Sequence, residues 1–89
     1  MIVYRMNMLH ALSEKQFNTG RIMREKVFGQ SDVQKLRDNI VLGMVGIDRL
    51  CKLLETQPGN IIRYIPDEDY ERMKEAGVLE PYEIPKVRK

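Results

Sequence analysis

Apolar residues recur at intervals of three and four along several short stretches of the chain, which is the pattern of amphipathic helices that share one core. This spacing predicts helices over residues 5–16, 18–26, 30–37 and 44–54. A further apolar group at residues 61–65 follows Pro58, a residue that suits the first position of a helix. We therefore expect a short fifth helix there.

Capping residues set the expected helix boundaries. The side chain of Asn18 can accept hydrogen bonds from the first turn of the helix that it precedes. Asp32 places a carboxylate in the first turn of helix 30–37, where the helix dipole favours a negative charge. Asp38 and Asn39 are typical turn residues, so the helix is expected to end before them.

The patterns at the two ends of the chain predict different structures. Residues 2–4 are β-prone and predict a short strand if a partner edge exists. Asp67 can cap a further helix at residues 68–76. Residues 78–89 contain two prolines and read as extended, and residues 82–84 form a second candidate strand that could pair with the first.

Together these elements predict an all-α fold. Five short helices at residues 4–66, with a short turn between the second and the third, are the arrangement of a helix-turn-helix DNA-binding domain. Residues 67–89 would form a C-terminal extension that consists of a short helix and an extended tail, and this extension could contact the second copy in a dimer or fold back on its own subunit.

Length and composition limit how this domain can be stabilised. A chain of 89 residues has room for one small domain, and such domains often depend on a disulfide, a metal or a partner chain. The single cysteine, Cys51, and the single histidine, His10, exclude an intrachain disulfide and a four-ligand Cys/His zinc set. A homodimer is therefore favoured. The sequence has no bilayer-spanning apolar run and no signal-peptide pattern, so we expect a cytoplasmic protein without a membrane partner.

Charge is distributed unevenly along the chain. Residues 1–65 carry ten Lys and Arg against six Asp and Glu, whereas residues 66–89 carry five against seven. The basic part is the candidate for binding a polyanion. The sequence has no phosphate-binding Gly-Lys-Ser/Thr loop, no metal-ligand spacing and no nucleophile beside an evident base. We accordingly expect no enzyme activity, no cofactor and no metal.

Residues 44–67 carry a more specific signal. The run from Leu50-Cys51 through Gln57-Pro58-Gly59 to Ile61-Ile62-Arg63-Tyr64 resembles the fourth and fifth helices of the lambda-repressor-like family, the Cro and xenobiotic-response-element type of transcriptional regulators. The resemblance extends over residues 4–67. It implies that residues 18–26 are the second helix and residues 30–37 the DNA-recognition helix, with Val33 and Leu36 at core positions.

The resemblance also implies which residues contact DNA. Four positions of the recognition helix would face the major groove: Gln30, Ser31, Gln34 and Lys35. A glutamine can pair with adenine through both groups of its amide, and a lysine can donate to guanine. Phosphate contacts are expected from Thr19 and the turn residues Arg37 and Asn39, and the cations Arg21 and Arg24 could neutralise further phosphates.

The chain also departs from the family pattern. Gly29 and Gly43 stand where the family usually has a Ser or Thr cap, and Gly20 and Gly46 lie inside helices, each at a cost of about 1 kcal/mol relative to alanine.

Two functions follow from these observations. The first is a sequence-specific DNA-binding transcriptional regulator, most simply a repressor that occupies a double-stranded operator as a homodimer. The alternative is a helix-turn-helix domain used for protein contact, as in an antirepressor or an inhibitor of another regulator. This alternative is motivated by the missing caps, the absence of arginine at the groove-facing positions and the acidic extension.

Overall fold

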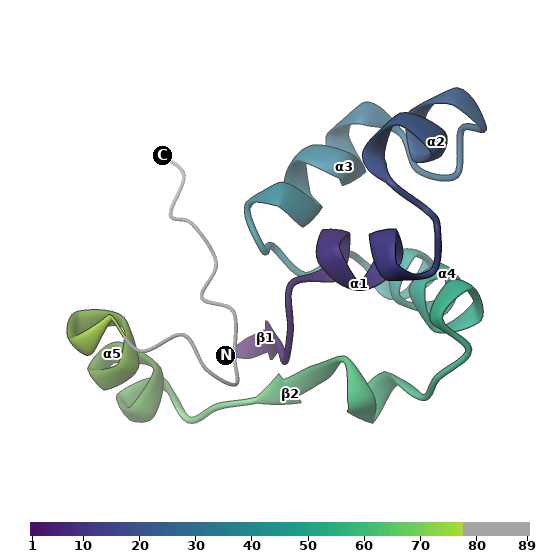
Figure 1. Ribbon diagram of the computed structural model, residues 1–89. Helices are drawn as coiled ribbons and strands as arrows, with labels where there is room; N and C mark the ends of the chain where they lie inside the picture. The colour runs from purple at the N-terminus through teal and green to yellow at the C-terminus, as the bar shows by residue number, and fades with distance from the viewer. Residues whose placement is uncertain (78–89) are drawn as a thin grey trace.

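The structure is a computed structural model that describes residues 1–77. Short helices and two short strands make up this part of the chain, and the two strands lie before and after a run of consecutive helices (Figure 1). In chain order the elements are β1 (Ile2–Tyr4), α1 (Met8–Glu14), α2 (Thr19–Arg24), α3 (Gln30–Arg37), α4 (Met44–Leu54), the 3-10 turn η1 (Pro58–Asn60), β2 (Ile62–Tyr64) and α5 (Asp67–Ala76).

A two-stranded antiparallel sheet shows that the expected all-α class is wrong. Strand β1 pairs with β2 so that Ile2 lies opposite Tyr64 and Tyr4 opposite Ile62. The backbone ladder continues beyond the strands, because the Ile65 amide donates to the Met1 carbonyl at 2.8 Å. The described fold is therefore mainly helical with a small sheet.

The same sheet corrects the expected fifth helix. Pro58–Asn60 form only one 3-10 turn, and the residues after it are extended. A short run of isoleucine and tyrosine suits a pleated strand, and here β1 supplies the partner edge. The predicted strand at residues 2–4 is confirmed, whereas its suggested partner at residues 82–84 and the extended tail lie outside the described residues.

Side-chain caps begin two of the helices. The Asn18 side chain accepts a hydrogen bond from the Arg21 amide at 2.8 Å, as predicted, and Asn7 caps α1 in the same way through the His10 amide at 3.0 Å. At α3 and α4 the N-cap residues are Gly29 and Gly43, and neither helix has a side-chain cap bond. The predicted bounds of α3 and α4 are confirmed.

Left-handed residues end the first four helices. Gln16, Lys26, Asn39 and Glu55 have φ values between 54° and 68°. After each, the next amide bonds back to the carbonyl five residues earlier, as Val27 does to Ile22 at 3.0 Å. This is the Schellman motif, which usually uses glycine at the left-handed position. Because none of these residues is glycine, the ends of these helices are hard to predict from residue type.

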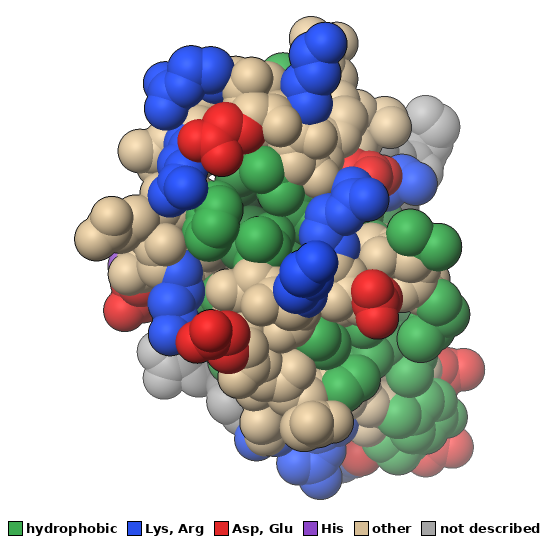
Figure 2. All heavy atoms as spheres, turned by 90° about the vertical axis from the view of Figure 1, so that its right-hand side faces the viewer, with side chains coloured by type: hydrophobic (Ala, Val, Ile, Leu, Met, Phe, Trp, Pro, Cys, Tyr) green, Lys and Arg blue, Asp and Glu red, His purple; other side chains and the backbone are tan. Residues whose placement is uncertain are grey.

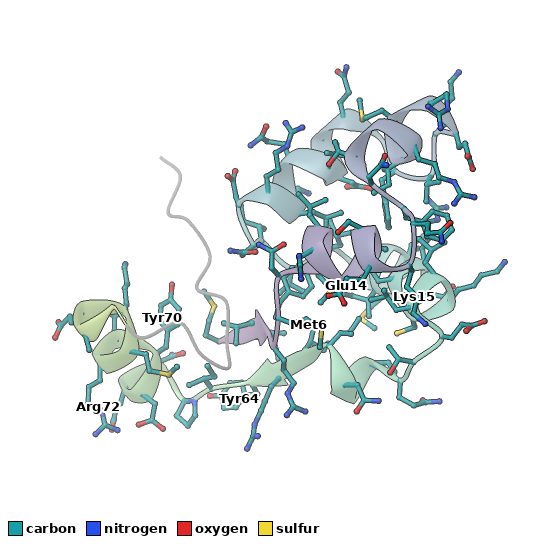
Figure 3. All side chains as sticks on the ribbon, viewed as in Figure 1. Met6, Glu14, Lys15, Tyr64, Tyr70 and Arg72 are labelled. Atoms are coloured by element: carbon teal, nitrogen blue, oxygen red, sulfur yellow. The ribbon has the colours of Figure 1, made fainter. Side chains whose placement is uncertain are left out.

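Two apolar clusters hold the elements together. The larger cluster lies beneath α1 to α4 and includes Tyr4 of β1 and Ile61. The smaller one joins Val3 and Ile65 to Tyr70 of α5, with Met73 packed against it. Tyr70 therefore attaches α5 to the sheet, at the opposite end of the molecule from α2 and α3 (Figures 1 and 3).

Candidate nucleic-acid interface

Helices α2 and α3 and the turn between them, residues 25–29, form the region in which the sequence placed the DNA contacts. Its inner side is apolar, since Ile22, Phe28, Val33 and Leu36 are at most 2% exposed. These four side chains belong to the larger core cluster, so the core fixes both helices from below. The polar residues of the region are left on the outside.

The outer side of α3 exposes three of the four predicted base-contacting residues. Gln30, Ser31 and Lys35 are exposed, whereas Gln34 is half-buried. The Gln34 amide nitrogen lies 3.4 Å from a carboxylate oxygen of Asp38, one helical turn further on. The structure thus brings amide, hydroxyl and ammonium groups together on one short helix, with Gln34 partly engaged inside the protein.

A shallow hollow separates α2 from α3. It is lined by Met23, Gln30, Val33, Gln34 and Arg37. Gln30, Gln34 and Arg37 are all predicted contacts, and the hollow therefore gathers both glutamines and one cation at the junction of the two helices.

Exposed cations surround these side chains. Arg24 and Lys26 lie at the end of α2, and Lys35 and Arg37 lie in the last turn of α3; all four are exposed. None of the four takes part in a salt bridge within residues 1–77. Figure 2 shows the adjoining side of the molecule, where Lys and Arg side chains are spread over the surface with scattered acidic groups between them. Cations without internal partners are available to an external polyanion.

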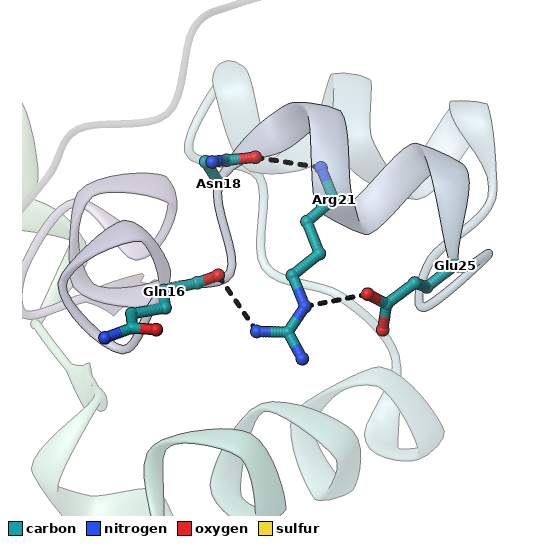
Figure 4. Close-up of polar contacts among 4 residues, drawn as sticks. All are labelled: Gln16, Asn18, Arg21 and Glu25. Atoms are coloured by element: carbon teal, nitrogen blue, oxygen red, sulfur yellow. Dashed lines mark hydrogen bonds and ion pairs between the residues drawn. The ribbon is translucent and has the colours of Figure 1, made fainter.

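Arg21 differs from these cations because its guanidinium is already engaged (Figure 4). Its Nε donates to Glu25 at 2.8 Å, and its Nη1 donates to the Gln16 carbonyl at 3.1 Å. The guanidinium also lies over the Phe17 ring, 4.4 Å from its centre. Arg21 therefore ties α2 to the end of α1, a structural task that its predicted role as a phosphate contact did not include.

The two remaining predicted contacts are less accessible. Thr19 is the first residue of α2 and is half-buried. Asn39 is 8% exposed and adopts the left-handed conformation that ends α3. Asn39 therefore lies in the turn after α3, and little of its side chain is exposed.

Arg49 is a relevant residue that the sequence did not single out. It lies on the outer side of α4, yet its Nη1 donates to the Val27 carbonyl in the α2–α3 turn at 2.8 Å. Its guanidinium carbon lies 5.7 Å from the centre of the Phe28 ring. Periodicity marks Arg49 only as a surface position, so no local signal pointed to this contact.

Metal sites, membrane-spanning helices and reactive cysteines are the other features that could give the described residues a function. In residues 1–77 no group of three or more His, Cys, Asp or Glu residues could hold a metal ion, and no helix is long and apolar enough to cross a membrane. Cys51 is half-buried on α4, where the predicted apolar stripe places it. Comparisons of the chain with protein-family models, curated proteins and solved structures found no match.

Proposed function

We propose that this protein is a sequence-specific regulator of transcription that binds double-stranded DNA and acts as a repressor by occupying an operator. The observation that carries the proposal is the two-sided character of α3. Its inner residues Val33 and Leu36 are buried, while Gln30, Ser31 and Lys35 project from it among cations that form no salt bridge within residues 1–77. A short polar helix of this kind fits the major groove of B-DNA.

The exposed groups of α3 match the edges of base pairs. The carbonyl and amino groups of Gln30 can bond adenine in two places, and the Lys35 ammonium can donate to the acceptors of guanine. Ser31 can serve either base. We expect Gln34 to contribute less, because its amide already faces Asp38.

Arg24, Lys26 and Arg37 supply the binding energy that does not depend on sequence. Each cation that neutralises a phosphate releases counterions, so the logarithm of the binding constant falls with the logarithm of salt concentration by about 0.9 per contact. Arg21 is the weakest candidate for this task, because Glu25 and the Gln16 carbonyl already hold its guanidinium.

Two sequence features add support. The resemblance of residues 44–67 to Cro-type regulators is independent of the α3 side chains, and residues 1–65 carry the net positive charge. A protein that covers an operator can exclude RNA polymerase without any further activity.

Binding to DNA can be tested without knowing the operator. The protein is used to select duplexes from a random pool, and the selected duplex is then titrated by fluorescence anisotropy at two salt concentrations. We expect Gln30→Ala and Lys35→Ala each to weaken binding to the selected duplex by about 1 to 3 kcal/mol while the thermal midpoint stays nearly unchanged, because both side chains are exposed.

Matched controls come from the same chain. Gln57 and Lys52 are exposed residues outside α2 and α3, and their alanine variants should bind as the unmodified protein does. Arg24→Gln should lower the salt slope by about one and affect all duplexes alike. If the protein shows no salt-sensitive binding to any duplex, the proposed function is wrong.

A further inference from the structure

One long-range contact joins α4 to the α2–α3 turn. The Arg49 guanidinium donates from Nη1 to the Val27 carbonyl at 2.8 Å and lies over the Phe28 ring. Val27 and Phe28 are half-buried and buried respectively, and Phe28 belongs to the core that also contains Val33 and Leu36 of α3. Arg49 thus holds both the backbone and an aromatic side chain of the turn.

The turn needs such a support. Its second residue, Lys26, is a left-handed non-glycine residue at φ 54°, a conformation that costs a residue with a side chain about 1 to 2 kcal/mol. At its other end, Gly29 begins α3 without a side-chain cap bond. Local conformational preferences therefore support the turn weakly, and Arg49 contacts it from outside the segment, in addition to the core packing of Val33 and Leu36 that holds α3.

We propose that Arg49 is a positioning residue that fixes the α2–α3 turn against α4 and so sets the orientation of α3. The inference rests on the proposed function. It implies that Arg49 contributes to discrimination between DNA sequences without touching DNA, because base contacts require their side chains to be held within a fraction of an ångström. Non-specific binding through phosphates depends far less on that orientation.

Arginine is the side chain that this contact requires. Its planar guanidinium can donate to a carbonyl along one edge and at the same time lie over an aromatic face. A lysine at the same position keeps the charge but makes a single-point contact, so it should hold the turn less firmly. Methionine keeps much of the aliphatic stem and removes both interactions.

The experiment compares Arg49→Met and Arg49→Lys with Lys52→Met, which removes a cation from the same helix at an exposed position. Two properties are measured without DNA: hydrogen exchange of the amides of residues 25–29, and the NMR shifts of the Phe28 ring. In Arg49→Met we expect exchange in the turn to rise about tenfold more than in α1, and the ring shifts to change. Arg49→Lys should lie between Arg49→Met and the unmodified protein, and Lys52→Met should change neither property.

Two further properties are measured with DNA: affinity for the selected and for an unrelated duplex, and the salt slope. We expect Arg49→Met to bind the selected duplex five- to thirtyfold more weakly, with unrelated duplex binding and the salt slope unchanged. A slope lowered by about one, with equal losses on both duplexes, would show a phosphate contact and overturn the proposal. Equal acceleration of exchange throughout the chain, or unchanged ring shifts, would also overturn it. If the unmodified protein binds no duplex, the proposed function fails, while the exchange and NMR measurements still decide whether Arg49 holds the turn.

Discussion

At the scale of single residues, the Tyr4 hydroxyl connects the sheet to the loop before α4. Tyr4 is fully buried, and its hydroxyl accepts a hydrogen bond from the Leu42 amide at 3.1 Å. Burial raises the pKa of Tyr4 above the usual 10.0, and the Asp32 carboxylate adds to this rise, whereas the Leu42 amide acts in the opposite direction. The folded protein therefore keeps this proton at pH values where the unfolded chain has lost it.

The raised pKa of Tyr4 predicts that the folded protein loses stability at alkaline pH. Its contribution is fully present below the pKa of the unfolded chain, about 10, and is lost as the pH rises from there through the raised pKa of the folded state. Urea unfolding from about pH 8 to about pH 11 should show a steeper decline for the unmodified protein than for Tyr4→Phe. At neutral pH, Tyr4→Phe should cost about 1 to 3 kcal/mol, because the Leu42 amide loses its acceptor. Tyr64→Phe, at an exposed tyrosine, is the control; if the slopes of Tyr4→Phe and the unmodified protein coincide, the account of Tyr4 is wrong.

At the scale of elements, two glycines inside helices have opposite surroundings. A β-carbon at Gly46 of α4 would lie 2.6 Å from the β-carbon of Leu42, which is buried. At Gly20 of α2 the nearest contact is the Asn18 side-chain oxygen at 3.4 Å, an ordinary distance. Gly46 is therefore required by packing, whereas Gly20 only weakens its helix.

Alanine substitutions should separate the two cases. We expect Gly20→Ala to raise the free energy of unfolding by roughly 0.5 to 1 kcal/mol, from its higher helix propensity. Gly46→Ala should lower it by about 1 to 3 kcal/mol, because Leu42 or α4 must move. Chemical denaturation of both variants measures the difference directly. If both variants change the free energy of unfolding in the same direction, this account of the packing around Leu42 is wrong.

An element can be predicted from the sequence when the interactions that form it lie within one segment, and not when they involve a distant segment. The bounds of α3 and the cap at Asn18 follow from periodicity and capping chemistry within one segment, and both are confirmed. The segment 61–65 was misassigned because a short apolar run fits a helix or a strand equally, and only pairing with the distant β1 decides between them.

In the candidate site, too, properties set within one helix could be predicted, whereas contacts with other segments could not. The exposure of Gln30 and Lys35 agrees with expectation, because a surface position can be recognised from its own helix. The contacts of Arg21 and Arg49 depend on carbonyls and rings of other segments, 22 residues away in the case of Arg49 and Val27. A pattern within one helix carries no information about such partners. DNA binding itself stays a prediction.

At the scale of the whole molecule, charge is separated between two ends. The exposed cations of α2 and α3 lie at one end, and α5 lies at the other, with Asp67, Glu68 and Asp69 in its first turn (Figure 1). In the field of a polyanion this arrangement favours approach with α3 first and keeps α5 away from the phosphates. If α3 binds DNA as proposed, the acidic helix would therefore remain available for other contacts.

On the proposed function, one copy of α3, with eight residues, would reach too few base pairs to be selective in a genome, so we expect a homodimer on an operator with two half-sites about one helical turn apart. Next to α5, Ile2 and Tyr64 lie opposite each other in the sheet and are 44% and 61% exposed. We expect both residues, together with α5, to form the contact between the two copies.

Sedimentation at micromolar concentration should give the mass of a dimer, and Tyr64→Ser should raise the dissociation constant of the dimer about tenfold or more. Val45→Ser, at an apolar residue of α4 that is 77% exposed, serves as the control. A monomer at these concentrations would contradict the dimer, and an effect of Val45→Ser without one of Tyr64→Ser would move the contact to α4.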